Sequence, residues 1–218
     1  MTGAPPRIPR ATYRLQLGRQ FTFADTAQLL PYLDRLGISH IYVSPFLEAR
    51  SGSSHGYDIT AYGRLNHEVG DQADFDVLAD QLRERTMGQI LDFVPNHMGI
   101  AKADNDWWLD VLEWGQASPY ADFFDIDWRP AKPDLRGKVL LPFLGDHYGH
   151  VLESGELSFA FDEEEGSFGV WYHEHLFPIG PAHYWYVFAS QLAEERSAGN
   201  ADTTEILQDV VTRSRALR

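Results

Sequence analysis

The sequence predicts an α/β fold built on a parallel sheet, and three observations indicate it. Residues 11–17 alternate side-chain character and favour β structure, as a strand does. Two further short apolar runs, residues 38–43 and 88–94, have the same character, and a helical pattern precedes each of them. Strands that alternate with helices pair in parallel through right-handed crossovers, so we expect one parallel sheet with helices packed against it.

The two predicted helices have recognisable ends. Thr22 followed by Asp25 has the form of a capping box, and Gly37 is the expected end of the first helix. Leucines at helical spacing lie between them: Leu29, Leu30, Leu33 and Leu36. The second helix is expected over residues 74–85, with Phe75, Leu78 and Leu82 on one face. Between these elements, residues 46–71 are rich in Ser and Gly and are expected to form a long functional loop.

The alternation stops after the third predicted strand. We expect a short capped helix at residues 104–112, a strand at 138–143 and a β-hairpin of 157–161 with 168–172. Two helices are expected to follow, at residues 184–195 and 203–217. The predicted domains are therefore residues 1–100, which form about three βα units, residues 101–183, an inserted subdomain over the carboxyl ends of the strands, and residues 184–218, a helical return segment.

Composition narrows the kinds of partner. The 218 residues carry a formal net charge of −14, which argues against nucleic acid and anionic membranes as ligands. There is no cysteine, which excludes disulfides and thiolate chemistry, and neither a signal peptide nor a membrane span is expected, so we predict a cytoplasmic protein. The 13 Phe, 10 Tyr and 6 Trp residues favour a neutral polyhydroxylated ligand, since aromatic rings stack on apolar ligand faces.

The first candidate site lies at the end of the third predicted strand. Asp92 falls within the strand, and Asn96 and His97 follow Pro95, which cannot donate to a sheet ladder. Polar side chains at the carboxyl ends of parallel strands are typical of α/β enzymes. The alternative is structural: Asp92 and Asn96 cap a turn while His97 satisfies a nearby carbonyl.

The second candidate site lies in the Ser- and Gly-rich segment, where His55, Tyr57 and Asp58 follow one another closely. Alone, this cluster is equally compatible with a tight turn. In a repeated βα arrangement, however, this segment and His97 lie at the same edge of the sheet, so we expect the two clusters to converge.

The residues of both sites resemble a known family. His-Gly-Tyr-Asp at residues 55–58, followed by Asp-Phe-Val-Pro-Asn-His at 92–97, is similar to the α-amylase-type enzymes of glycoside hydrolase family 13. Residues 51–58, 65–66, 119–128 and 144–149 resemble the maltooligosyltrehalose synthase branch of that family. The resemblance implies the N-terminal part of a (β/α)8 TIM barrel with an insertion after strand 3. It also implies intramolecular transglucosylation, which converts the reducing-end linkage of a maltooligosaccharide from α-1,4 to α,α-1,1 in trehalose biosynthesis.

The resemblance implies substrate-binding roles for His55, Tyr57, Asp58, Asp92, Asn96 and His97. His97 would hydrogen-bond the reacting glucose, Tyr57 would stack beneath it and His55 would assist. Asp92 and Asn96 would hold the strand end in shape. Retaining glycosyl transfer needs two carboxyl groups about 5 Å apart, which the family carries on its fourth and fifth strands. We expect the chain to end before the fourth strand, so no catalytic residue is assigned and the chain is expected to be inactive alone.

Two alternatives remain open at this stage. The first is a free-standing α-glucan-binding module without chemistry. The second is a metal-dependent hydrolase that uses His147 with His150, or His173 with His175. The acidic run at residues 162–165 is more simply a solvated hairpin tip than a calcium site. We expect no metal and no cofactor, and as partners a maltooligosaccharide or α-glucan, with either the missing C-terminal part of the barrel or a second copy of the chain.

Overall fold

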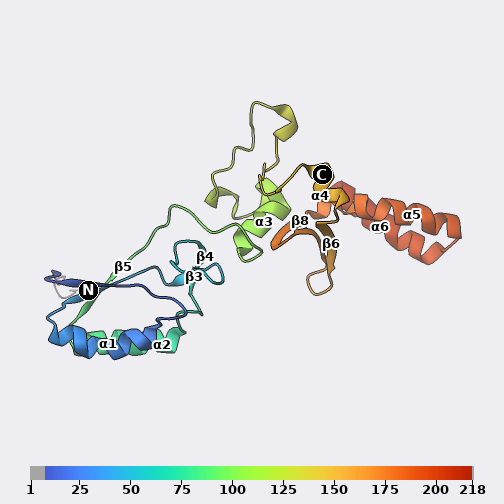
Figure 1. Cartoon of the computed structure of the whole chain (residues 1–218). Coiled ribbons are helices and arrows are strands. Elements are labelled where there is room, and N and C mark those ends of the chain that lie inside the picture. Colours follow the sequence, from blue (N-terminus) through green and yellow to red (C-terminus); the bar gives the residue numbers. More distant parts are fainter. Residues whose placement is uncertain (1–7, 218) are drawn as a thin grey trace, which may run out of the picture. The chain divides into compact units, whose positions relative to one another are not determined.

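The computed structural model describes residues 8–217, which form two compact units that divide between Ile100 and Ala101 (Figure 1). Unit 1 contains, in chain order, β1 (Thr12–Leu15), α1 (Phe23–Arg35), β2 (His40–Val43), β3 (Leu47–Ala49), β4 (Ile59–Leu65), α2 (Gln72–Glu84) and β5 (Gly88–Leu91). Unit 2 contains α3 (Asp106–Trp114), α4 (Tyr148–Glu153), β6 (Leu157–Asp162), β7 (Ser167–Tyr172), β8 (His175–Ile179), α5 (Tyr184–Ala198) and α6 (Ala201–Ala216). Short 3-10 helices lie at Gly115–Ala117, Ala121–Phe123, Pro133–Leu135 and Pro181–His183.

Unit 1 is built on a three-stranded parallel sheet in the order β1-β2-β5. Both pairings are parallel, which confirms the prediction from the alternating pattern. Leu15 pairs in register with Val43, and Val43 pairs with Leu91. Because side chains alternate between the faces of a strand, this register decides which residues face the helices and which face the other side.

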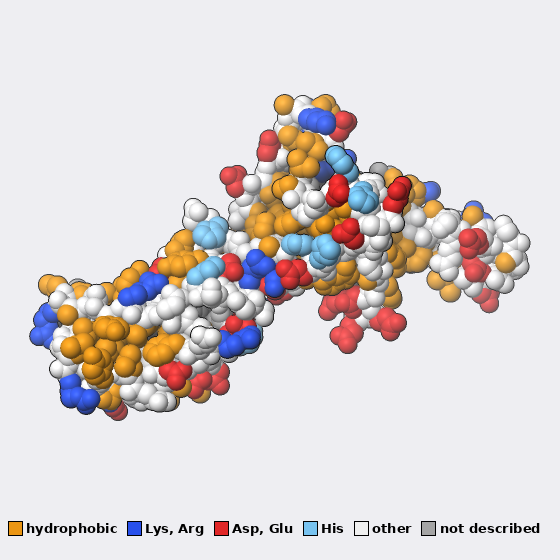
Figure 2. Space-filling model, in the orientation of Figure 1, with side chains coloured by type: hydrophobic (Ala, Val, Ile, Leu, Met, Phe, Trp, Pro, Cys, Tyr) orange, Lys and Arg blue, Asp and Glu red, His pale blue; other side chains and the backbone are white. Residues whose placement is uncertain are grey.

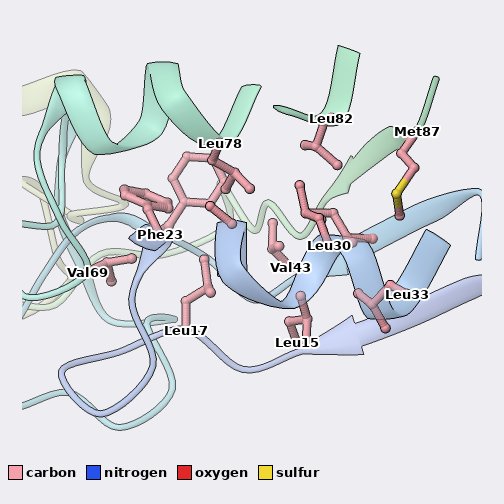
Figure 3. Close-up of a cluster of buried hydrophobic side chains, with 13 residues drawn as sticks. Leu15, Leu17, Phe23, Leu30, Leu33, Val43, Val69, Leu78, Leu82 and Met87 are labelled. Carbon is pink, nitrogen blue, oxygen red and sulfur yellow. The ribbon is translucent and has the colours of Figure 1, made fainter. Parts of the chain in front are cut away.

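Helices α1 and α2 lie side by side against one face of this sheet (Figure 1). From the sheet, Leu15, Ile41 and Val43 are buried against the helices. The helices and their flanking turns contribute further buried side chains to the same core, as Figure 3 shows: Phe23, Leu30, Leu33, Val69, Leu78, Leu82 and Met87. Removing this apolar surface from water is the main favourable term that holds unit 1 together.

The opposite face of the sheet is polar. Arg14 of β1 pairs in register with Tyr42 of β2, and Tyr42 pairs with Ile90 of β5. Asp92 lies two residues beyond Ile90 and therefore on the same face. In a closed βα barrel the face opposite the helices is the barrel interior.

Both helices of unit 1 begin with a capping box. Thr22 and Asp25 exchange backbone-to-side-chain hydrogen bonds of 2.9 and 3.3 Å, which confirms the predicted start of α1. At α2, Asp71 and Asp74 make the equivalent pair at 3.2 and 2.9 Å. Each box satisfies backbone N–H groups that have no partner within the helix.

The expectation of an uninterrupted loop over residues 46–71 is wrong. Within it, β3 and β4 form an antiparallel pair whose register shifts on both sides of Glu48. A strand of three residues with an irregular register carries almost no alternating pattern, so the sequence gives little sign of it. The segment between β3 and β4 retains the loop that carries the second candidate site.

In unit 2, β6, β7 and β8 form an antiparallel sheet. The predicted hairpin of β6 and β7 is confirmed, whereas β8 was not predicted. The acidic residues between β6 and β7 are exposed and gather at the tip of the hairpin (Figure 2). Two helices follow as expected, and α5 packs on α6 through Trp185, Phe188, Leu192, Leu207 and Val211.

The predicted strand over residues 138–143 is wrong. These residues adopt no regular secondary structure, and the Leu140 side chain is 74% exposed. Pro142 has no N–H to donate to a sheet ladder, and in the described residues no strand pairs with this run.

Candidate functional site

Asp92 lies at the carboxyl end of β5, next to the end of the central strand β2. The strand β5 ends at Leu91, three residues earlier than the predicted end, because β2, the strand with which it pairs, ends at Val43. The Asp92 backbone N–H still donates to the carbonyl of Val43 at 3.3 Å. This bond fixes where the side chain of Asp92 leaves the sheet.

Three side chains donate hydrogen bonds to one carboxylate oxygen, Oδ2 of Asp92. The Tyr57 hydroxyl lies at 2.6 Å, Nη1 of Arg14 at 2.8 Å and the Tyr42 hydroxyl at 3.2 Å. The Asp92 side chain is 10% exposed. The guanidinium of Arg14 also lies 4.6 Å above the centre of the Tyr42 ring, a cation–π contact. We call these four residues the Asp92 cluster.

The electrostatics of the cluster favour an ionised Asp92. Burial acts to raise the pKa of this carboxyl, but the hydrogen bonds from Tyr57, Arg14 and Tyr42 outweigh burial, and the pKa is lowered. The same contact raises the pKa of the Tyr42 hydroxyl, because a phenol that donates to a carboxylate resists losing its proton. The cluster therefore carries a fixed negative charge at neutral pH beside a fixed positive one.

The loop between β3 and β4 brings His55, Tyr57 and Asp58 together. The Tyr57 backbone N–H donates to Nδ1 of His55 at 3.0 Å, and the two rings lie nearly parallel with centres 5.9 Å apart. Asp58 Oδ1 accepts from the Ser53 hydroxyl at 2.5 Å and lies 3.8 Å from Nδ1 of His55. The His55 side chain is 53% exposed, so the imidazole is open to solvent beside the Tyr57 ring.

Gly56 allows this loop to form. It has a φ of +77°, and a β-carbon there would lie 2.5 Å from the carbonyl oxygen of Pro45. A side chain at this position meets both the left-handed backbone and a backbone atom that cannot move aside. The close approach holds the loop against the end of β2.

Asn96 lies in a turn after β5 and His97 directly follows it, and both are exposed. The Tyr62 hydroxyl donates to the backbone carbonyl of His97 at 3.0 Å. Over residues 8–217, no hydrogen bond joins the Asn96 or His97 side chain to the Asp92 cluster. The structure thus links Tyr57 directly to Asp92 and keeps His55 and Asp58 beside Tyr57, whereas the side chains of Asn96 and His97 are not joined to them.

Sequence reasoning missed Arg14 and Tyr42. Arg14 alternates with the buried Leu15, and Tyr42 with the buried Ile41 and Val43, so both were identifiable as residues of the non-core face. Their meeting with Asp92 depends on the register of three strands that are far apart in the chain, and one strand pattern alone carries no information about that register.

The histidines considered as metal ligands make pairwise contacts in unit 2. His150 Nδ1 lies 2.6 Å from Oδ2 of Asp146, and His173 Nε2 lies 3.3 Å from Oε2 of Glu156. In the described residues there is no group of three or more His, Asp or Glu side chains arranged to hold a metal ion.

A parallel sheet with helices on one face and a hydrogen-bonded polar cluster at the carboxyl ends of its strands is the arrangement found in the βα units of an α/β barrel. The chain belongs to the α-amylase family: the family model described as "Alpha amylase, catalytic domain" matches residues 24–175. Its fold is accordingly part of a TIM barrel, and the described sheet of unit 1 is open rather than closed.

The relatives within this family are more specific. The chain is 47% identical over 141 residues to a putative maltooligosyl trehalose synthase of Mycobacterium tuberculosis, a match that covers 62% of this chain and 18% of the relative. The solved maltooligosyltrehalose synthase of Arthrobacter ramosus is 43% identical, with a TM-score of 0.67 over 79% of this chain and 21% of that one. A hypothetical maltooligosyl trehalose synthase from Sulfolobus tokodaii is 30% identical, with a TM-score of 0.67 over 86% of this chain and 24% of that one.

The chain therefore spans about a fifth of the length of the relatives that it matches. Across residues 8–217, none of the helices combines the length and the apolar character that crossing a membrane requires.

Proposed function

We propose that residues 8–100 form the glucose-binding part of an enzyme of the maltooligosyltrehalose synthase type. In this proposal the Asp92 cluster and the loop beside it hold one glucose unit of a maltooligosaccharide at the carboxyl ends of β1, β2 and β5. Residues 101–183 would be the subdomain inserted after the third barrel strand, and residues 184–218 the helical return segment. The observation that carries the proposal is the direct hydrogen bond between Tyr57 and Asp92, made in a chain 47% identical to a relative named for this activity.

The geometry suits a neutral sugar. Tyr57 has its hydroxyl anchored on Asp92 and is only partly buried, so its ring is held in one orientation and keeps an apolar surface. The C–H faces of a pyranose pack on such a ring, and its hydroxyls need donors and acceptors nearby. The exposed imidazoles of His55 and His97 are groups of this kind.

Within this proposal each residue has a separate task. Tyr57 is the stacking platform, His97 hydrogen-bonds the reacting glucose and His55 assists its binding. Asp92 and Asn96 hold the strand end in shape, and Asp58 fixes the loop through Ser53. Arg14 and Tyr42, which also hold Asp92, act on the sugar only through that carboxylate.

The proposed reaction of the whole enzyme is an intramolecular glucosyl transfer. The bond between O4 of the reducing-end glucose and C1 of its neighbour breaks, and that C1, which carries the rest of the chain, bonds to the anomeric oxygen of the released glucose as an α,α-1,1 linkage. The proton of the anomeric hydroxyl is lost and O4 of the same glucose gains one, so the reaction is an isomerisation. Such a transfer with retained configuration uses a carboxylate nucleophile and a carboxylic acid about 5 Å apart. We assign neither role to a residue of this chain.

The test is a comparison of two glucans that differ only in linkage. Two-dimensional NMR spectra of the histidine ring protons would be recorded as maltopentaose or cellopentaose is added to the chain. The signals of His55 and His97, assigned with His55→Gln and His97→Gln variants, are expected to shift with maltopentaose and not with cellopentaose. Equal shifts with both sugars, or none with either, would contradict the proposal.

A further inference from the structure

We propose that Glu68 is a positioning residue that ties down residues 51–57 and thereby sets the positions of His55 and Tyr57. This inference rests on the function proposed above for the site that Glu68 orders. Glu68 lies in the turn between β4 and α2 and is not one of the residues that would face the sugar.

A single oxygen of Glu68 gathers two other segments of unit 1. Oε1 accepts from Nη2 of Arg19 at 2.6 Å, from the backbone N–H of Gly52 at 3.1 Å and from the hydroxyl of Ser51 at 3.4 Å. Arg19 lies in the connection between β1 and α1, whereas Ser51 and Gly52 begin the loop that carries His55 and Tyr57. The Glu68 side chain is 7% exposed, whereas that of its partner Arg19 is 72% exposed.

The carboxylate is itself mounted on a rigid turn. The Glu68 backbone N–H donates to Oδ1 of Asn66 at 2.9 Å, and the Asn66 side chain is buried. The Asn66 backbone N–H donates in turn to the carbonyl of Phe46 at 2.9 Å, and the following Val69 is in the core. Glu68 therefore holds the loop at a fixed position relative to the core.

The side of the loop that faces Arg19 and Glu68 is not held by dense side-chain packing. A pocket of about 520 Å³ opens there, and its lining includes Gln16, Ser53 and Ser54 as well as Arg19 and Glu68. A segment beside an open pocket lacks the dense contacts that fix a core side chain, so hydrogen bonds must hold it. Other contacts to the loop from β1 and the residue that follows it are long: Nε2 of Gln16 lies 3.4 Å from each of the carbonyls of Ser54 and His55, and Nη2 of Arg14 lies 3.5 Å from the Tyr57 hydroxyl.

The charge of Glu68 is maintained at neutral pH. Burial acts to raise the pKa of this carboxyl, but the hydrogen bonds from Arg19 and from the Gly52 amide outweigh it, and the pKa is lowered. Hydrogen bonds to an ionised acceptor are stronger than neutral ones, which suits a residue that holds a loop by few contacts.

The experiment measures the mobility of the loop directly and needs no sugar. Amide hydrogen exchange of the full chain would be followed by mass spectrometry in peptides that cover residues 51–57, together with the NMR signal of the His55 ring. Glu68→Ala removes the oxygen that accepts hydrogen bonds from Arg19, Ser51 and Gly52. It is therefore expected to speed exchange in these peptides by about tenfold and to shift or broaden the His55 signal. Glu68→Gln, which keeps an acceptor for Gly52 but loses the charge, is expected to have a smaller effect of the same kind.

The matched control is Asp80→Ala, which removes another carboxylate–arginine pair of unit 1, the exposed pair of Asp80 with Arg83. It is expected to leave both readouts unchanged. If Glu68→Ala does not fold, Arg19→Ala takes its place: it removes only the exposed partner and is expected to speed exchange in the same peptides several-fold. Arg19→Lys, which keeps the charge, is expected to restore most of the protection.

Three results would overturn the inference: unchanged exchange in residues 51–57 of a folded Glu68 variant, an increase shared equally by the peptides of α1 and β2, or an unmoved His55 signal. Unchanged exchange or an unmoved His55 signal would show that Glu68 does not hold the loop. An increase shared equally with α1 and β2 would show a general loss of stability. If the wild-type chain does not bind maltopentaose and the exchange results are as expected, the proposed function fails while the positioning role of Glu68 stands.

Discussion

The hydroxyl of Tyr57 lies 2.6 Å from Oδ2 of Asp92, although the two residues are 35 positions apart in the chain. This hydrogen bond ties the loop between β3 and β4 to the end of β5, the third strand of the parallel sheet. The aromatic ring of one candidate site is thus oriented by the carboxylate of the other. The two sequence motifs that resemble the α-amylase family act as one unit in the structure.

Removing this hydroxyl should destabilise unit 1. Tyr57→Phe keeps the ring but breaks a hydrogen bond to an ionised carboxylate, so we expect the free energy of unfolding to fall by about 1.5–3 kcal/mol. Urea unfolding followed by tyrosine and tryptophan fluorescence measures it. Tyr32→Phe, at an exposed position of α1, is the control and should be neutral. A loss no larger than the control's would show that the bond contributes nothing to stability.

The Asp92 cluster should also make stability depend on pH. The pKa of Asp92 is lowered in the folded chain from its usual 3.8, so its stabilising effect is fully present above that value and is lost as the pH falls through the folded-state pKa. Asp92→Asn should therefore be less stable than the wild type at pH 7, and the difference should shrink below about pH 4. Urea titrations of both proteins from pH 7 down to about pH 2 test this. A difference that stays constant with pH would be inconsistent with an ionised Asp92 in the cluster.

Gly56 should tolerate alanine poorly. Gly56→Ala places a methyl group 2.5 Å from the Pro45 carbonyl, in addition to forcing alanine into a left-handed conformation. Gly37→Ala is the matched control, since Gly37 also has a positive φ, +87°, and a β-carbon there meets nothing within 4 Å. The control should lose about 1–2 kcal/mol of unfolding free energy, and Gly56→Ala more than twice that. Equal losses would mean that the loop can move away from β2 without cost.

Part of the fold could be predicted from the sequence, and part of it could not. The capping box at Thr22, the parallel strands and the β6–β7 hairpin follow from local patterns, because caps, alternation and turns are properties of neighbouring residues. The pairing of β3 with β4 was missed because its register shifts hide the alternation. The predicted strand over residues 138–143 failed because an apolar run does not reveal whether a partner strand is present.

Some residues of the candidate site could likewise be predicted from the sequence, and others could not. The motif residues His55, Tyr57 and Asp92 were identifiable as polar groups near strand ends. Arg14 was not, because its contact with Asp92 depends on how β1 is placed across β2 from β5. Long-range register is decided by packing of the whole sheet.

The open sheet of unit 1 should promote self-association. In the described residues β1 and β5 are its outer strands, and Leu91 on β5 is 57% exposed. An unpaired edge beside exposed apolar residues is a template for pairing with another chain, whereas a lysine on the edge opposes it. Light scattering should show association that Leu91→Lys reduces and that Val77→Lys, at a 53% exposed position of α2, does not. A monomer at high concentration with a sharp thermal transition would mean that the chain covers these edges itself.

The 218-residue chain is expected not to convert maltopentaose into a trehalose-ended product. The resemblance assigns the required carboxyl pair to barrel strands that none of the recognised motifs of this chain matches. Incubation of the purified chain with maltopentaose, followed by chromatography of the sugars, tests this. Turnover by a preparation of verified mass would show that the reacting carboxyl groups lie within this chain.

The most direct test of the account is the binding of maltopentaose to the chain measured by calorimetry, with Tyr57→Ala and His97→Ala as variants and Tyr32→Ala as the exposed control. If Tyr57 is the platform for a glucose unit, Tyr57→Ala should weaken binding by about 1 kcal/mol, with a similar loss for His97→Ala and none for the control. Binding that is unchanged in both site variants, or absent from the wild-type chain, would contradict the proposed glucose site.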